Sequence, residues 1–147
     1  SVLNNTDLIF ANSNQGVVLR SPKGYCFRIY LNDAGFINTQ RIICHKYNDP
    51  QSNIEKLDLA FNNTNNGVIL KKPDGTCMKI KVTNASTVFA LPTNCNQTVN
   101  GLKVATGDIV IETPTKGIVL KDDQGFCHRV TVDDYGFLNV LKLISCL

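Results

Sequence analysis

Six cysteines provide the most distinctive chemistry in this sequence, because they fall into three pairs of similar spacing: Cys26 with Cys44, Cys77 with Cys95, and Cys127 with Cys146. Each pair flanks an expected β-hairpin, in which opposed residues bring their Cβ atoms to roughly 4.5–5.5 Å. A small local adjustment then reaches disulfide geometry. We therefore predict these three disulfides rather than six free thiols. A zinc site is not expected, because the sequence has no Cys-x-x-Cys motif.

The predicted disulfides indicate an oxidising compartment, so we expect a secreted, extracellular or virion-surface protein. The chain starts at Ser1 without an apolar leader, which fits both a mature secreted protein and an excised fragment. N-glycosylation motifs agree with this compartment and begin at Asn4, Asn62, Asn84 and Asn96. Two of them fall at expected turns, where a glycan fits, although an asparagine-rich chain also contains such motifs by chance.

A basic residue follows the first cysteine of each pair by two positions, at Arg28, Lys79 and Arg129. In one interpretation these side chains form a solvated outer face and cover the disulfides with their aliphatic stems. In the other, they bind acidic ligands such as sialylated or sulfated sugars, and arginine binds a carboxylate or sulfate through two hydrogen bonds. Tyr25 and Phe126 directly precede the cysteines of the first and third pairs, where they are candidates to stack on a sugar ring.

Side chains suited to catalysis are scarce. Of the two histidines, His128 is expected on the core face of a strand and His45 in an exposed linker. No short motif combines a nucleophile, a base and an orienting group, and no glycine-rich phosphate loop is present. Aspartate pairs at 122–123 and 133–134 fall at expected turns and lack EF-hand spacing. We therefore expect no enzymatic activity, no cofactor and no metal site.

The cysteine pairs belong to an internal repeat that divides the chain into residues 1–50, 51–100 and 101–147. Within each unit an aspartate precedes a glycine by nine residues, an apolar segment follows, and a second glycine lies eight residues beyond the first. The aspartates are Asp7, Asp58 and Asp108. Successive units are offset by 51 and 50 residues, which predicts a single domain of three equivalent repeats.

Alternating side chains predict four strands per repeat. In the first repeat these are Asp7–Ala11, Val17–Arg20, Tyr25–Leu31 and Phe36–Cys44. The third strand and its copies are expected to supply the inward face of the core, through Phe27, Ile29, Leu31, Ile80, Val82, Val130 and Val132. The linking segments 45–56 and 96–107 can add an irregular strand each.

The predicted fold is all-β, with three four-strand repeats closed around a pseudo-threefold axis as a β-trefoil or a three-sided β-prism. Closure is favoured over an open solenoid because no repeat is a distinct polar cap and because closure removes exposed strand edges. A length of 147 residues with 43% apolar residues suits one domain. The net charge of +3 does not suggest a nucleic-acid partner, and no apolar run approaches roughly 18 residues, so membrane insertion is not expected.

The third repeat combines Gly117–Lys121, Gly125 and Arg129–Leu138 in one hairpin motif. This motif resembles hairpins near the ends of phage tail-fibre and receptor-binding proteins, in which one copy per chain commonly stands in a trimer. Three copies in one chain would imitate such a trimer, and the resemblance implies surface attachment rather than catalysis. The three-repeat arrangement also resembles β-trefoil proteins, but without tryptophan the chain lacks the Gln-x-Trp signature of ricin-type lectins.

These observations predict a secreted, non-catalytic attachment or recognition module whose partner is a surface glycan or a protein receptor. The alternative is a structural subunit of an extracellular filament or coat, whose partners are copies of itself. In that case the alternating apolar residues Val2, Leu8 and Phe10 are candidates to pair with the sheet edge of a neighbour. A protease inhibitor on a trefoil scaffold is a third possibility that no particular loop favours.

Overall fold

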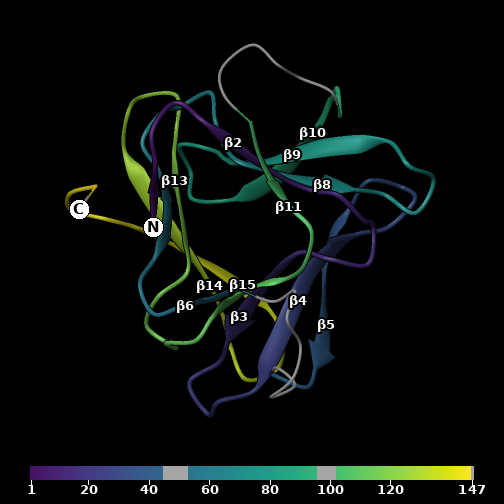
Figure 1. Ribbon diagram of the computed structural model, residues 1–147. Helices are drawn as coiled ribbons and strands as arrows, with labels where there is room; N and C mark the ends of the chain where they lie inside the picture. Colours follow the sequence, from purple (N-terminus) through teal and green to yellow (C-terminus); the bar gives the residue numbers. More distant parts are fainter. Residues whose placement is uncertain (45–52, 96–101, 147) are drawn as a thin grey trace.

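A computed structural model describes residues 1–44, 53–95 and 102–146, and all of its regular structure is β (Figure 1). The strands are β1 (Val2–Leu3), β2 (Asp7–Phe10), β3 (Val17–Arg20), β4 (Cys26–Leu31), β5 (Ile37–Ile42), β6 (Asn53–Glu55), β7 (Leu59–Phe61), β8 (Val68–Lys71), β9 (Cys77–Val82), β10 (Val88–Thr93), β11 (Leu102–Ala105), β12 (Ile109–Ile111), β13 (Ile118–Lys121), β14 (Cys127–Val132) and β15 (Leu138–Lys142). No helical segment that could span a bilayer occurs among the described residues.

Each repeat contains five strands, so the prediction of four was wrong by one. The additional strand is the short first one, β1, β6 or β11, which precedes the repeated aspartate. Two of these strands, β6 and β11, lie in the linking segments 45–56 and 96–107, which the sequence suggested can add an irregular strand each. With two to four residues each, they are too short for their alternation to be recognised in the sequence.

The fifteen strands form three five-stranded sheets, and every sheet combines strands from all three repeats. One repeat supplies an antiparallel three-strand meander, and the other two repeats add one parallel strand each. We name the sheets after the repeat that supplies the meander. The strand orders are β5-β4-β3-β12-β6 in the repeat-1 sheet, β10-β9-β8-β2-β11 in the repeat-2 sheet and β1-β7-β13-β14-β15 in the repeat-3 sheet.

The parallel pairings close the three repeats into a ring. Strand β2 of repeat 1 pairs with β8 of repeat 2, β7 of repeat 2 pairs with β13 of repeat 3, and β12 of repeat 3 pairs back onto β3 of repeat 1. The two ends of the chain lie on the same side of the molecule (Figure 1). Val2 and Cys146 border the same small hollow at the repeat-3 sheet. The three sheets remain separate and form no closed barrel, and their threefold arrangement is consistent with the predicted trefoil-like or prism-like closure.

The inner faces of the three sheets share one apolar core. All seven residues predicted to face inward belong to it, each with at most 5% of its surface exposed, which confirms the predicted strand faces. The repeated glycine before the apolar segment is required by close packing. A Cβ atom on Gly16 would lie 2.5 Å from the carbonyl oxygen of Ile29, and one on Gly67 would lie equally close to that of Ile80.

Replacing Ile29 by alanine tests this assignment of faces. Ile29 is 2% exposed at the centre of the shared core, and removing a buried aliphatic side chain costs about 2–5 kcal/mol of unfolding free energy. Ile43→Ala is the matched control, because Ile43 is 74% exposed. Chemical denaturation should show the loss for Ile29→Ala only, and equal stability of the two variants would mean that the faces are reversed.

Candidate functional site

All three predicted disulfides are present: Cys26–Cys44, Cys77–Cys95 and Cys127–Cys146. Three disulfides in a domain of this size are consistent with an extracellular protein. The register differs from the expected one, because Cys26 faces Ile42 rather than Cys44. The hairpin turn lies earlier than assumed, with Leu31 opposite Ile37, so Cys44 bridges back from just beyond the strand end.

The three repeated cations each bind an aspartate of the preceding repeat. The Arg28 guanidinium contacts Asp108 at 3.0 and 2.5 Å, and Arg129 contacts Asp58 at 3.0 and 2.7 Å. Lys79 makes the third pair through a single contact of 2.9 Å with Asp7. Each of the three aspartates also accepts the backbone N–H of the repeated glycine, at 2.8–2.9 Å. We call this arrangement of aspartate, glycine and cation the inter-repeat clasp.

The clasp occupies the cations that were candidates for binding acidic ligands. Their side chains are only 11–21% exposed, and the partner carboxylates are 5–13% exposed. The hydrogen bonds that Arg129 donates to Asp58 raise the pKa of its guanidinium and outweigh the opposing effect of burial. The repeated cation is therefore explained by contacts inside the molecule.

The aromatic candidates lie apart from the clasps, beside the disulfides. The Tyr25 ring is covered by the Arg41 guanidinium at 3.9 Å, and the Phe126 ring contacts Lys142 at 4.1 Å. Each is a cation–π contact between the residue that precedes one strand and a residue of the neighbouring strand. Each ring is therefore paired with a cation other than Arg28, Lys79 or Arg129.

Three of the predicted glycosylation asparagines are exposed: Asn4, Asn62 and Asn84. Asn62 Nδ2 donates a hydrogen bond of 2.5 Å to Asn4 Oδ1, which brings two of the motifs together. Asn84 lies on the turn between β9 and β10. Asn96 and the linker histidine His45 lie outside the described residues.

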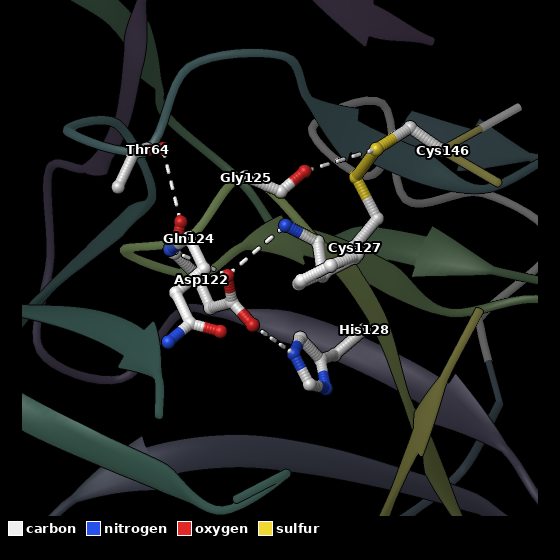
Figure 2. The surroundings of a disulfide bond; sticks show 8 residues. Thr64, Asp122, Gln124, Gly125, Cys127, His128 and Cys146 are labelled. Atoms are coloured by element: carbon white, nitrogen blue, oxygen red, sulfur yellow. Dashed lines mark hydrogen bonds and ion pairs between the residues drawn. A yellow bond between two sulfur atoms is a disulfide. The ribbon is translucent and has the colours of Figure 1, made fainter. Parts of the chain in front are cut away.

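His128 lies on the core face as predicted and is completely buried, and it belongs to a polar cluster that the sequence did not reveal. Its Nε2 lies 2.7 Å from Asp122 Oδ2, a contact marked by a dashed line in Figure 2. Its Nδ1 lies 2.9 Å from Ser86 Oγ. Asp122 Oδ1 accepts the backbone N–H groups of Gln124 and Phe126. Burial alone would raise the pKa of Asp122, but these hydrogen bonds and that from His128 outweigh it and lower the pKa.

This cluster replaces an apolar contact that the other repeat junctions make. In each junction the turn between the last two strands of one repeat packs against a β4-type strand of the next repeat. Gly35 approaches Met78 and Gly136 approaches Phe27, whereas Ser86 hydrogen-bonds to His128. In the described part of the chain no three His, Cys, Asp or Glu side chains are grouped to hold a metal ion.

A surface cavity lies where the first residues of β5, β10 and β15 come together with the turns of repeats 1 and 3. It has a volume of about 680 Å³, and we call it the axial hollow. All three repeats line it, through residues 35–39, 88–90 and 135–138. Three aromatic side chains border it with large exposed fractions: Phe36 at 67%, Tyr135 at 84% and Phe137 at 69%. None of the described residues that line it carries a charge.

Sequence reasoning missed the axial hollow, although a signal was present. Phe36 and Phe137 directly follow the turn glycines and alternate with the inward residues Ile37 and Leu138. An aromatic residue that points outward beside a turn in two of three repeats is not needed by the core. Aromatic residues that are exposed together in one patch are typical of a binding surface.

Breaking one clasp should destabilise the whole ring. Arg129→Ala leaves the nearly buried Asp58 carboxylate without its cation, and removing one partner of a buried pair costs about 3–5 kcal/mol. Because Arg129 is about one-fifth exposed, we expect a loss near 2–4 kcal/mol in urea denaturation. Arg41→Ala, which removes an exposed arginine of the same type, should cost less than about 1 kcal/mol. A loss no larger than that of the control would mean that the clasp is not needed for stability.

Acid should release a contact that holds one turn beside the axial hollow. Asp134 Oδ1 accepts the backbone N–H of Lys23 at 2.8 Å, and this hydrogen bond lowers the pKa of Asp134 from its ordinary value of 3.8. The stabilising contact is therefore complete above pH 3.8 and is lost as the pH falls through the lowered pKa. In an NMR titration the Lys23 amide should shift with a midpoint below 3.8, and Asp134→Asn should remove that step. A midpoint at or above 3.8 would contradict the contact.

Comparison with protein-family models, curated proteins and solved structures finds no match to this chain.

Proposed function

We propose that this protein is a recognition and attachment module that binds an uncharged ring of a surface glycan in the axial hollow. The observation that carries the proposal is the hollow itself, an uncharged cavity bordered by three exposed aromatic side chains. Its volume falls within the range of about 300–1,000 Å³ typical of small-ligand sites. Aromatic faces stack on the C–H face of a sugar, and the amide of Asn38 and the hydroxyl of Thr39 supply polar partners.

The preference for a neutral ligand follows from where the charges lie. Arg28, Lys79 and Arg129 are held in the clasps, and the hollow contains no side chain that would offset the charge of a sialic acid or sulfate. Burying an uncompensated anion is costly. An acidic glycan is therefore a poorer ligand than a neutral one.

The framework around the hollow favours binding without rearrangement. The turns that line it are tied to neighbouring repeats, as when Asp134 accepts the N–H of Lys23 and Thr39 Oγ1 donates to the carbonyl of Gly136. The disulfides close the opposite ends of the same hairpins. A site that is already ordered avoids part of the entropic cost of binding a ligand.

A glycan array with neutral and acidic members tests this function. The double variant Phe36→Ala with Phe137→Ala should weaken binding at least about 10-fold, since buried aromatic contacts are typical hot spots. Phe126→Ala is the matched control, because it removes an exposed phenylalanine beside a disulfide. Binding to neutral sugars should also change little between low and physiological salt. Unchanged binding by the double variant, or binding restricted to acidic glycans, would refute the assignment.

Self-assembly into a filament or coat is the alternative function, and one feature favours it. Each sheet ends in two edge strands, and three of these edges, β5, β10 and β15, are five or six residues long. Unpaired edges are templates for pairing with another chain. Light scattering over a range of concentrations separates the two functions, because a recognition module stays monomeric whereas a filament subunit grows with concentration.

A further inference from the structure

We propose that Ser86 is a nucleophilic serine that accepts an acyl group, with His128 as its base and Asp122 as the group that orients the base. This activity goes beyond recognition and does not depend on which ligand occupies the axial hollow. It rests on three side chains, from three separate segments of the chain, that meet at the junction of repeats 2 and 3.

The hydrogen-bond pattern assigns the protons in this cluster. The ionised carboxylate of Asp122 can only accept, so the His128 Nε2 at 2.7 Å must carry a hydrogen. In the neutral imidazole Nδ1 then has a free lone pair, and it accepts the hydroxyl hydrogen of Ser86 across 2.9 Å. A serine within hydrogen-bond reach of a base that a third group orients is the arrangement required for nucleophilic catalysis.

Burial distinguishes the roles of the three groups. The ring of His128 and the carboxylate of Asp122 are shielded from solvent, with exposed fractions of 0% and 1%. Ser86 as a whole residue is only half-buried, so it is the member of the cluster that lies nearest to solvent. Water therefore does not compete with Ser86 for the hydrogen bond to His128, whereas an acyl donor can approach the serine.

The backbone at Ser86 is a second, independent indication. Its φ of 63° lies in the left-handed region, and the equivalent positions of the other repeats are Gly35 and Gly136. A non-glycine residue in this region is strained, and such residues concentrate at functional sites. The position of Asp122 is likewise serine in repeat 1 and lysine in repeat 2, at Ser21 and Lys72. The three side chains of the cluster thus occur together at one junction only.

The chemistry balances without an added cofactor. Ser86 Oγ attacks the carbonyl carbon of an ester and forms a C–O bond while its proton moves to His128 Nδ1. The bond to the leaving alcohol then breaks, and His128 returns the proton to that alcohol, leaving acyl-Ser86. Asp122 stabilises the transient imidazolium through Nε2–H. The acyl donor is therefore an ester, whose alcohol leaves with the returned proton.

The same turn predicts that the acyl group is released slowly. The N–H of Ser86 donates to the carbonyl of Thr83, and those of Ala85 and Thr87 donate to the Thr83 hydroxyl. These three N–H groups are therefore not free to stabilise an oxyanion, a contribution that accounts for a large part of the rate in acyl transfer. We expect one equivalent of acylation followed by slow turnover, and not fast hydrolysis.

The test uses an alkyl fluorophosphonate, which phosphonylates an activated serine and releases fluoride with the serine proton as HF. The full chain should gain one adduct by intact-mass spectrometry, and peptide mapping should place it on Ser86. Ser86→Ala should abolish the adduct. Asp122→Asn should slow labelling at least about 100-fold. Its amide can donate to Nε2 and so place the hydrogen of the imidazole on Nδ1, which removes the base while the hydrogen bonds to the backbone are kept.

A matched control separates activation from mere exposure. Gly35→Ser in the Ser86→Ala background places a serine on the equivalent turn of repeat 1, where it faces the flexible side chain of Met78 instead of a histidine. This variant should remain unlabelled, and so should the wild type after urea unfolding. Failure of the folded wild type to label overturns the proposal, as does an equal rate for wild type and Asp122→Asn. Thermal melts of each variant show that it is folded during the reaction.

Discussion

The inter-repeat clasp is the interaction on which the rest of the structure depends. One carboxylate binds the glycine N–H and the cation of the next repeat, so the second strand of one repeat is fixed beside the third strand of another. Because repeat 3 is joined in this way to repeat 1, the three clasps form a closed cycle. A change at one clasp therefore acts on two sheets at once. The clasps also stabilise the parallel strand pairs that complete each five-stranded sheet.

The strand faces and the disulfides could be predicted from the sequence, whereas contacts that depend on a neighbouring repeat could not. Alternation identified the inward face from Phe27 to Leu31, and the similar spacing of the cysteine pairs identified the disulfides, because both are properties of a single hairpin. The partner of Arg28 was hidden, since Asp7 of its own repeat and Asp108 of another are equivalent in the sequence. Arg28 pairs with Asp108 because strands are exchanged between repeats, and this exchange could not be predicted from the sequence. The axial hollow was hidden for the same reason, since its walls come from all three repeats.

Departures from the repeat are more informative than the repeat itself. Positions that all copies share, such as the clasp residues and the cysteines, are accounted for by folding. The exposed Phe36, Tyr135 and Phe137 and the polar contact between Ser86 and His128 are not needed by the common framework, because another repeat does without each of them. A framework closed by three equivalent clasps tolerates such local differences, since no single turn has to hold the ring together.

Threefold closure also explains why these departures lie at contacts between repeats. Within each hairpin the strand ends that carry the cysteines are covalently closed, and the neighbouring rings of Tyr25 and Phe126 are engaged by Arg41 and Lys142. Where β5, β10 and β15 begin, residues from all three repeats become neighbours although they lie far apart in the sequence. A changed side chain in one repeat thus alters a cavity that all three repeats share, and the exposed positions around it can vary at little cost to the core.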